Sequence, residues 1–211
     1  MTRIGVLFSG RGSNMGALFA AAARPGFGGT FALAVGNVPE AGGFALAAGA
    51  GVPSVLIDHR PFATDREAHE RAIDAALQER GVELVCLAGY LRRLTPFLVR
   101  RWAGRMLNVH PSLLPSFPGL HTHHRALAAG VKLHGCTVHV VTEGVDEGPI
   151  LAQAAIPVLP GDDEDRLAAR VLRQEHVLYP ATLARMLGGA TKSADEQSAL
   201  LNPLPSPAAA P

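Results

Sequence analysis

The chain is 211 residues long, and its 48% hydrophobic and 18% charged residues are typical of one globular domain rather than a disordered protein. A formal net charge of +1 argues against a large nucleic-acid surface, so we expect small molecules as partners. No apolar run approaches the roughly 20 residues that cross a bilayer, no signal peptide is evident, and two cysteines are too few for a disulfide scaffold, so we expect a cytoplasmic protein.

Strand-like and helix-like segments alternate over most of the chain. The continuous apolar runs 4–8 and 84–88 predict strands that are covered on both faces, as in a parallel sheet. Segment 65–80 has apolar and polar residues at helical spacing and predicts an amphipathic helix. The other elements expected before residue 109 are strands at 30–36, 54–57 and 105–108 and helices at 14–23, 42–50 and 95–100.

After residue 115 the regular alternation of strand-like and helix-like segments ends. A helix is expected at 122–129, and segments 135–142 and 149–157 predict an antiparallel pair at the sheet edge. Acidic residues at 162–165 begin a long helix through residue 186, which Gly188 and Gly189 end. Residues 190–211, rich in Pro, Ala and Ser, are expected to be a disordered tail behind a domain of residues 1–189.

These elements predict an α/β fold, with a Rossmann-like, mainly parallel twisted sheet, helices on both faces and an antiparallel edge. Such sheets bind ligands at the carboxyl ends of their strands. We therefore expect the functional residues in the loops where strands end.

A glycine-rich loop, residues 9–14, joins the first expected strand to the first helix. Its glycines allow a tight turn, and the free N–H groups at the start of the helix favour an anion such as a phosphate. Met15 stands where the dinucleotide fingerprint needs a glycine, and the lysine of a Walker loop is absent, so a monophosphate fits better than NAD or ATP. Ser13 and Asn14, both good cap residues, favour an anion site over the alternative of a plain glycine turn.

Residues 108–115 (Asn-Val-His-Pro-Ser-Leu-Leu-Pro) end an apolar strand. Asn108 and His110 are two apart on an extended segment, so both side chains point the same way, and Pro111 stops further pairing because it has no N–H. Their amide and imidazole suit the stabilisation of an oxyanion and the movement of one proton. Asp146, in a turn before another strand, is a candidate partner of His110, although each residue alone also has a structural explanation.

With these motifs in hand, the chain resembles the folate-dependent glycinamide ribonucleotide formyltransferases of purine biosynthesis. The resemblance runs from about residue 3 to residue 187. It rests on the glycine loop, the 108–115 block and segments 87–94, 118–123, 145–150 and 174–176. The 108–115 block alone indicates only the wider formyltransferase superfamily.

The resemblance implies transfer of a formyl group from 10-formyltetrahydrofolate, as cosubstrate and without a metal, to the amine of 5-phosphoribosylglycinamide. The catalytic positions that it implies are Asn108, His110 and Asp146. The implied substrate-binding positions are Gly12, Ser13 and Asn14 for the phosphate and Glu175 for the ribose. The implied folate-binding positions are Arg66, Leu91, Arg92, Arg93, Leu94 and Asn108. The chain departs from the family's usual pattern at Tyr90 and Arg93, which flank the expected pterin pocket.

Formyl transfer to an amine passes through a tetrahedral intermediate with negative charge on the former carbonyl oxygen, and each donor placed there is worth ~3–4 kcal/mol. We expect Asn108 and a protonated His110 to be these donors. Asp146 is expected to raise the pKa of His110 and to take up, through a water, the proton that the amine loses. His110 then protonates the departing folate nitrogen, so neither Cys86 nor Cys136 is needed as a nucleophile.

A cluster of histidines, His121, His123, His124 and His134, raises the question of a zinc site. Their spacing matches no metal motif, and adjacent histidines on a helix face different directions, so we expect no metal. His121 and His139 are better explained as active-site or core histidines. Five arginines between residues 92 and 105 are expected to form mostly a solvated face.

Two other functions stay open. A formyltetrahydrofolate hydrolase uses water in place of the amine, although such proteins carry an additional N-terminal domain for which we see no room. A non-catalytic phosphosugar- or folate-binding protein on the same fold has no reason to keep an Asn, a His and an Asp together. Methionyl-tRNA formyltransferase is disfavoured by the lack of an RNA-binding domain and by the balanced charge. A monomer and a homodimer both fit the sequence.

Overall fold

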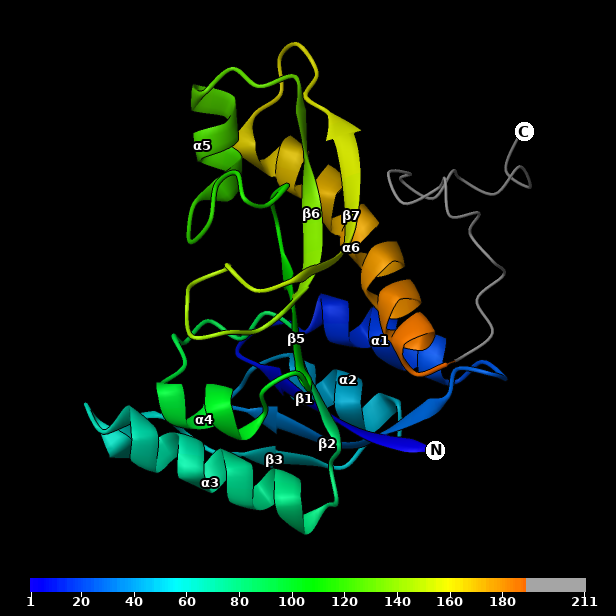
Figure 1. Ribbon diagram of the computed structural model, residues 1–211, viewed down its shortest axis with the longest axis vertical. Coiled ribbons are helices and arrows are strands. Elements are labelled where there is room, and N and C mark those ends of the chain that lie inside the picture. The colour runs from blue at the N-terminus through cyan, green and yellow to red at the C-terminus, as the bar shows by residue number, and fades with distance from the viewer. Residues whose placement is uncertain (189–211) are drawn as a thin grey trace.

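The computed structural model describes residues 1–188 and contains a seven-stranded sheet with helices on both faces (Figure 1). The strands are β1 (Thr2–Phe8), β2 (Gly29–Gly36), β3 (Ser54–Leu56), β4 (Leu84–Leu87), β5 (Met106–His110), β6 (Leu133–Val140) and β7 (Ile150–Pro157). Their order in the sheet is β3-β2-β1-β4-β5-β6-β7. The first five strands pair in parallel, whereas β6 is antiparallel to β5 and β7 to β6. The predicted fold class is confirmed.

Helices connect and cover these strands. They are α1 (Ser13–Ala22), α2 (Gly43–Gly49), α3 (Arg66–Glu79), α4 (Pro96–Arg101), α5 (Thr122–Ala128) and α6 (Glu164–Met186), with a short 3₁₀ turn η1 (Arg60–Phe62). The longer helices begin at acidic caps: Asp65 accepts a hydrogen bond from the Ala68 N–H before α3, and Asp163 accepts one from the Arg166 N–H before α6. The acidic start predicted for the long helix is confirmed.

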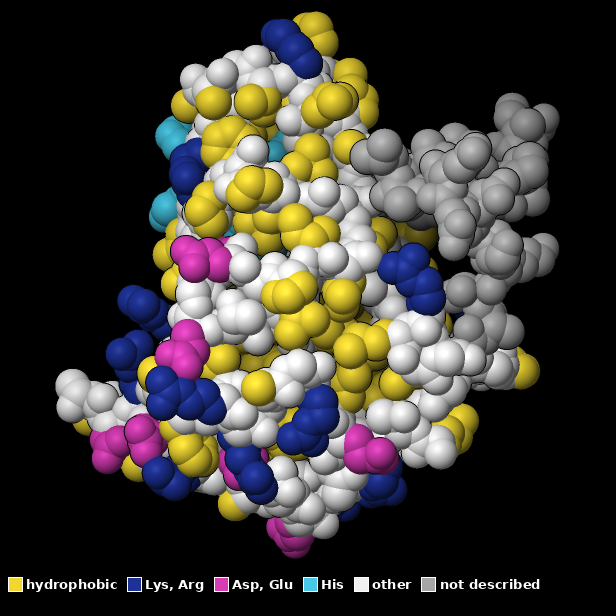
Figure 2. Space-filling model, viewed as in Figure 1, with side chains coloured by type: hydrophobic (Ala, Val, Ile, Leu, Met, Phe, Trp, Pro, Cys, Tyr) yellow, Lys and Arg dark blue, Asp and Glu magenta, His cyan; other side chains and the backbone are white. Residues whose placement is uncertain are grey.

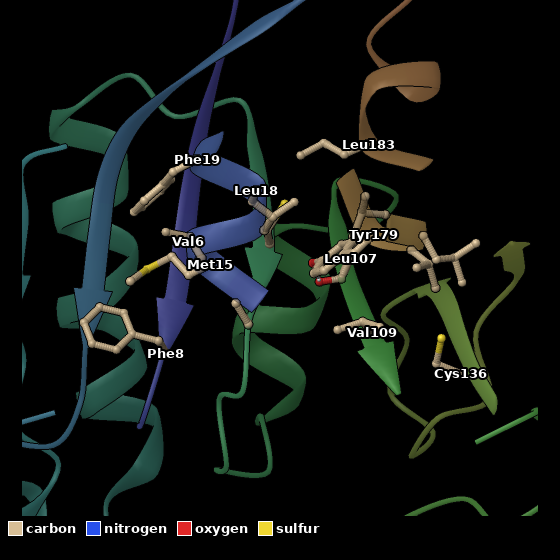
Figure 3. Close-up of a cluster of buried hydrophobic side chains, with 14 of the residues drawn as sticks. Val6, Phe8, Met15, Leu18, Phe19, Leu107, Val109, Cys136, Tyr179 and Leu183 are labelled. Atoms are coloured by element: carbon tan, nitrogen blue, oxygen red, sulfur yellow. Dashed lines mark hydrogen bonds between the residues drawn. The ribbon is translucent and has the colours of Figure 1, made fainter. Parts of the chain in front are cut away.

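A separate hydrophobic core lies on each face of the sheet. Val6 and Phe8 of β1 point into the core beneath α1 and α6, while Leu7 points into the core beneath α3 and α4. This alternation explains why the strand is apolar throughout, as predicted for a strand covered on both faces. Figure 3 shows Leu18 of α1 and Tyr179 of α6 among the side chains of the first core.

The observed elements differ from the predicted ones in places. β5 continues through His110, because that residue still pairs with Thr137 of β6 before Pro111 interrupts the strand. β6 begins at Leu133, two residues before its predicted start. The η1 turn was not predicted. The long helix ends as predicted near Gly188, which has φ +69°, whereas Gly189 and the proposed 190–211 tail lie outside the described residues.

Charged side chains of both signs lie side by side over α3 and α4 (Figure 2). Two of the arginines expected to form mostly a solvated face also form ion pairs: Arg100 contacts Glu143 at 2.7 Å and Arg101 contacts Asp74 at 3.1 Å.

Among residues 1–188, no helix is both long enough and apolar enough to cross a membrane.

Candidate active site

The Asp146 carboxylate joins three parts of the chain near the end of β5. Its Oδ2 lies 3.3 Å from Nδ1 of His110 and accepts a 2.8 Å hydrogen bond from the Gly119 N–H. Its Oδ1 lies 3.6 Å from Nε2 of His139 on β6. The side chains of His110, His139 and Asp146 are 7%, 3% and 13% exposed, so solvent screens these contacts little.

Asn108 joins this cluster through His139. The two residues are opposite each other on β5 and β6, and Nδ2 of Asn108 lies 3.3 Å from Nε2 of His139. The structure thus brings Asn108, His110 and Asp146 together around His139. The sequence analysis had placed this histidine either in the core or in the active site. An amide, an imidazole and a carboxylate within reach of one another can stabilise an oxyanion and move a proton.

Asp146 raises the pKa of His110 as expected, but the net shift is downward. Burial lowers the pKa of His110 below its ordinary value, and this effect outweighs the opposing hydrogen bond to Phe117 and the charge of Asp146. Nε2 of His110 lies 3.0 Å from the Phe117 carbonyl oxygen, so each ring nitrogen faces an oxygen. Only a doubly protonated ring donates to both, and burial makes that form a readier proton donor.

Asp146 remains an anion at neutral pH. Burial alone would raise the pKa of Asp146, but hydrogen bonds from His139 and Gly119 and the nearby His110 lower it below its ordinary value. The backbone of Asp146 is left-handed, with φ +57°. Since that conformation costs a non-glycine residue on the order of 1 kcal/mol, the surrounding contacts must hold it in place.

The glycine loop has the form of an anion site. Gly12 is left-handed (φ +76°), and a Cβ on it would lie 3.0 Å from the Gly43 Cα, so both the turn and the approach of α2 require glycine. Ser13 and Asn14, suggested as caps, lie inside the first turn of α1, because Gly12 takes the N-cap position. The first N–H groups of a helix have no partner within it and are available to an anion.

Asn14 connects this loop to α6. Its Nδ2 donates a 2.7 Å hydrogen bond to Oε2 of Glu175, a residue that is 6% exposed. Burial raises the pKa of Glu175, and the hydrogen bond from Asn14 opposes that rise. Asn14 and Glu175, predicted to bind one substrate, are therefore brought together although 161 residues separate them.

Half of the predicted folate positions line one surface pocket of about 400 Å³. Its lining consists of Arg66, Arg93, Leu94, Thr95, Pro96, Val99 and Glu143. Leu91, which is 78% exposed, Arg92 and Asn108 lie outside that lining. Tyr90 is half-buried against the second core, where burial raises its pKa.

The other residues considered in the sequence analysis are the remaining histidines and the cysteines. His121 is exposed, so it is not a core histidine, whereas His139 is buried. His123 and His134 pair with each other at 3.1 Å, and no group of three or more His, Cys, Asp or Glu side chains in residues 1–188 could hold a metal. Burial raises the pKa of the Cys86 thiol to about 12, which makes it a poor nucleophile.

Two backbone groups of the site were missed from the sequence. The Gly119 N–H binds Asp146, and the Phe117 carbonyl faces His110. Gly119 lies within the 118–123 motif, which was the available signal. Every residue carries a backbone carbonyl, so no feature of the sequence could indicate that the carbonyl of Phe117 faces His110.

Comparison with known proteins places the chain in one family. The family model described as "Formyl transferase" matches residues 2–183. The phosphoribosylglycinamide formyltransferase of Escherichia coli (strain K12) is 41% identical over 187 residues, which are 89% of this chain and 88% of that protein. The crystal structure of phosphoribosylglycinamide formyltransferase from Brucella melitensis is 53% identical with a TM-score of 0.84, and covers 92% of this chain and 99% of that chain.

Other relatives are much longer. The trifunctional purine biosynthetic protein adenosine-3 of Drosophila melanogaster is 45% identical over 198 residues, which are 93% of this chain. The chain spans only 15% of the length of that relative. The similarity therefore concerns one part of such proteins.

Proposed function

The chain belongs to the formyl transferase family, and we propose that it is a phosphoribosylglycinamide formyltransferase of purine biosynthesis. It transfers a formyl group from 10-formyltetrahydrofolate to the amine of 5-phosphoribosylglycinamide. The observation that carries this proposal is the convergence of Asn108, His110 and Asp146 at one partly buried point, where His139 links Asn108 to Asp146. We do not extend this proposal to the other activities of the trifunctional relatives.

The proposed reaction begins when the amine attacks the formyl carbon. Negative charge develops on the former carbonyl oxygen, and preorganised donors at that oxygen are each worth ~3–4 kcal/mol. The Asn108 amide nitrogen lies beside His139 and carries two hydrogens, one of which donates to the oxyanion. His110 is the second donor once the oxyanion replaces the Phe117 carbonyl at Nε2, and its hydrogen bond is charge-assisted when the ring is protonated.

Two proton transfers complete the exchange. Asp146, whose lowered pKa keeps it ionised, takes up through a water the proton that the amine loses. His110 gives a proton to the departing folate nitrogen, and the lowered pKa of His110 makes it a stronger acid for this step. No covalent enzyme intermediate is required.

The phosphorylated substrate is proposed to lie between the glycine loop and α6. Gly12, Ser13 and Asn14 surround the phosphate with backbone N–H groups. The Glu175 carboxylate accepts hydrogen bonds from the ribose hydroxyls. The Oδ1 atom of Asn14 is buried without a partner in the described part of the chain, which leaves it free to accept from the substrate.

The formyl donor is proposed to bind along the segment after β4, at Leu91, Arg92, Arg93 and Leu94, with Arg66 beside it and Asn108 at the reacting end. The arginines supply positive charge for the donor's glutamate carboxylates. We propose that residues 1–189 form the catalytic domain, with 190–211 as a tail. We further propose that the protein acts on these two small molecules in the cytoplasm, without a metal, as a monomer or a homodimer.

A direct assay tests the proposed function. The purified protein is mixed with 10-formyltetrahydrofolate, and release of the folate is followed by absorbance with and without 5-phosphoribosylglycinamide. Release that requires the amine is expected. Release without the amine would indicate a hydrolase, and no release in either mixture would favour a non-catalytic binding protein.

A further inference from the structure

A buried carboxylate lies beneath the segment that carries the proposed folate-binding residues. Glu70 of α3 is 3% exposed. Its Oε1 accepts a 2.8 Å hydrogen bond from the Thr95 N–H, and its Oε2 accepts a short one from the Thr95 hydroxyl. Thr95 is the N-cap residue of α4, yet its own side chain makes no cap hydrogen bond. A carboxylate from one helix therefore fixes the start of the next.

The other end of this segment is anchored as well. The Leu91 N–H donates a 2.9 Å hydrogen bond to the Ser9 hydroxyl, and the Ser9 N–H donates a 3.0 Å bond to the Gly89 carbonyl. Residues 91–95 thus run between an anchor on the glycine loop and an anchor on α3. Arg93 and Leu94, which line the pocket, lie between the two anchors.

Glu70 also stands close to the pocket through its own helix. Arg66 lies four residues earlier on α3, on the same side, and lines the pocket. Burial raises the pKa of Glu70, while hydrogen bonds from Thr95 and Leu98 and the charge of Arg66 oppose that rise. Glu70 itself is not among the lining residues, so it acts on the pocket through the chain that it holds.

We propose that Glu70 is a positioning residue for the formyl donor: by binding the backbone and hydroxyl of Thr95, it holds residues 91–95 in the conformation that receives the folate. This inference rests on the proposed function. It predicts that loss of Glu70 weakens binding of one substrate and leaves the chemical step intact.

The test compares the kinetics of two substitutions at this position. Glu70→Ala removes both acceptors and is expected to raise the KM for 10-formyltetrahydrofolate about tenfold. The kcat and the KM for 5-phosphoribosylglycinamide should stay within twofold of wild type. Glu70→Gln keeps one acceptor for the Thr95 N–H, and its amide can donate to the hydroxyl, so it should restore most of the lost affinity.

Asp74 supplies a matched control on the same helix. It accepts hydrogen bonds from Trp102 Nε1 at 3.0 Å and from Arg101 Nε at 3.1 Å, and so joins α3 to the other end of α4. Asp74→Ala should lower thermal stability without raising the KM for the formyl donor more than twofold. An equal rise in that KM would overturn the proposal, because general loosening of α3 and α4 would then explain the effect.

Two further measurements keep the test decisive. Thr95→Val removes the hydroxyl alone and should raise the same KM less than Glu70→Ala does, so it replaces Glu70→Ala if that variant does not fold. Amide hydrogen exchange of residues 91–95 should accelerate in Glu70→Ala and not in Asp74→Ala. Unchanged exchange and an unchanged KM would refute the role of Glu70. A wild-type protein that releases no folate would instead refute the proposed function.

Discussion

Asp146 derives its properties from the groups around it. Its carboxylate contacts His110, His139 and the Gly119 N–H, and its backbone is held in the left-handed region. We predict that Asp146→Asn lowers kcat roughly 10²–10⁴-fold, because a neutral amide neither accepts the proton of the amine nor stabilises a protonated His110. The KM values of both substrates should change little, as measured by steady-state kinetics.

The control for this variant is the neighbouring carboxylate. Glu147 lies next to Asp146 in the β6–β7 connection and is exposed. Glu147→Gln should retain nearly full turnover. Near-normal turnover by Asp146→Asn would remove Asp146 from the mechanism.

His110 shows what residue identity and spacing leave undetermined. The sequence predicted both its place and its partner, since Pro111 marks the end of the strand and Asp146 lies in the turn of a recognised motif. The upward effect of Asp146 on the pKa of His110 was predicted, but the net shift is downward because burial, which was not considered, outweighs it. Burial depends on the packing of distant segments around the ring, such as β6, whose Thr137 pairs with His110.

The contact between α1 and α6 buries the Glu175 carboxylate, and its burial lowers the stability of the folded protein when the unfolded chain can ionise that group. Glu175 lies on α6 with Asn14 of α1 as its hydrogen-bond donor, and burial raises the pKa of Glu175 above its ordinary value of 4.5. Between these two pKa values the folded state binds more protons than the unfolded chain, so stability falls as pH rises through that interval. The cost remains at neutral pH, where the unfolded chain is free to ionise.

We therefore predict that Glu175→Gln stabilises the protein at pH 7.5 while weakening substrate binding. The gain is on the order of 1 kcal/mol, or about 2–4 °C in Tm, and the glutamine oxygen can still accept from Asn14. Thermal unfolding at pH 7.5 and pH 4 measures it, and the gain should vanish at the lower pH. A Glu175→Gln protein that is less stable at pH 7.5 would contradict this account.

Predictions for helices and strands succeeded where periodicity reflects burial. The apolar runs of β1 and β4 correspond to strands that the structure buries on both faces, whereas β6, predicted only as part of an edge pair, is also buried at every position from residue 134 to residue 139. In α3 the spacing of the alanines predicted an amphipathic helix, but the residues that the structure buries are His69, Glu70, Ile73 and Leu77. Glu70 is buried because α4 supplies Thr95 as a donor, and hydrophobic periodicity does not report such a contact.

The molecule buries histidines widely, and this affects its stability as a whole. Burial lowers the pKa of His69, His110, His123, His134 and His176 below the ordinary value of 6.5. The unfolded chain then binds more protons than the folded protein below that value, so stability falls with acidification. Two buried glutamates with raised pKa values act in the opposite direction, but five histidines outnumber them.

We predict that the free energy of unfolding decreases as pH falls from about 6.5 to 4, and that His134 contributes measurably to this slope. Burial lowers the pKa of His134 to about 4, and its ring faces His123 at 3.1 Å and the edge of Phe117. His134→Gln removes one titrating group, so the slope should fall by up to about 1.4 kcal/mol per pH unit. Urea unfolding at pH values across this window measures the slope. His124→Gln, at an exposed position on α5, should leave it unchanged, and an equal effect of both substitutions would show that burial of His134 is not the cause.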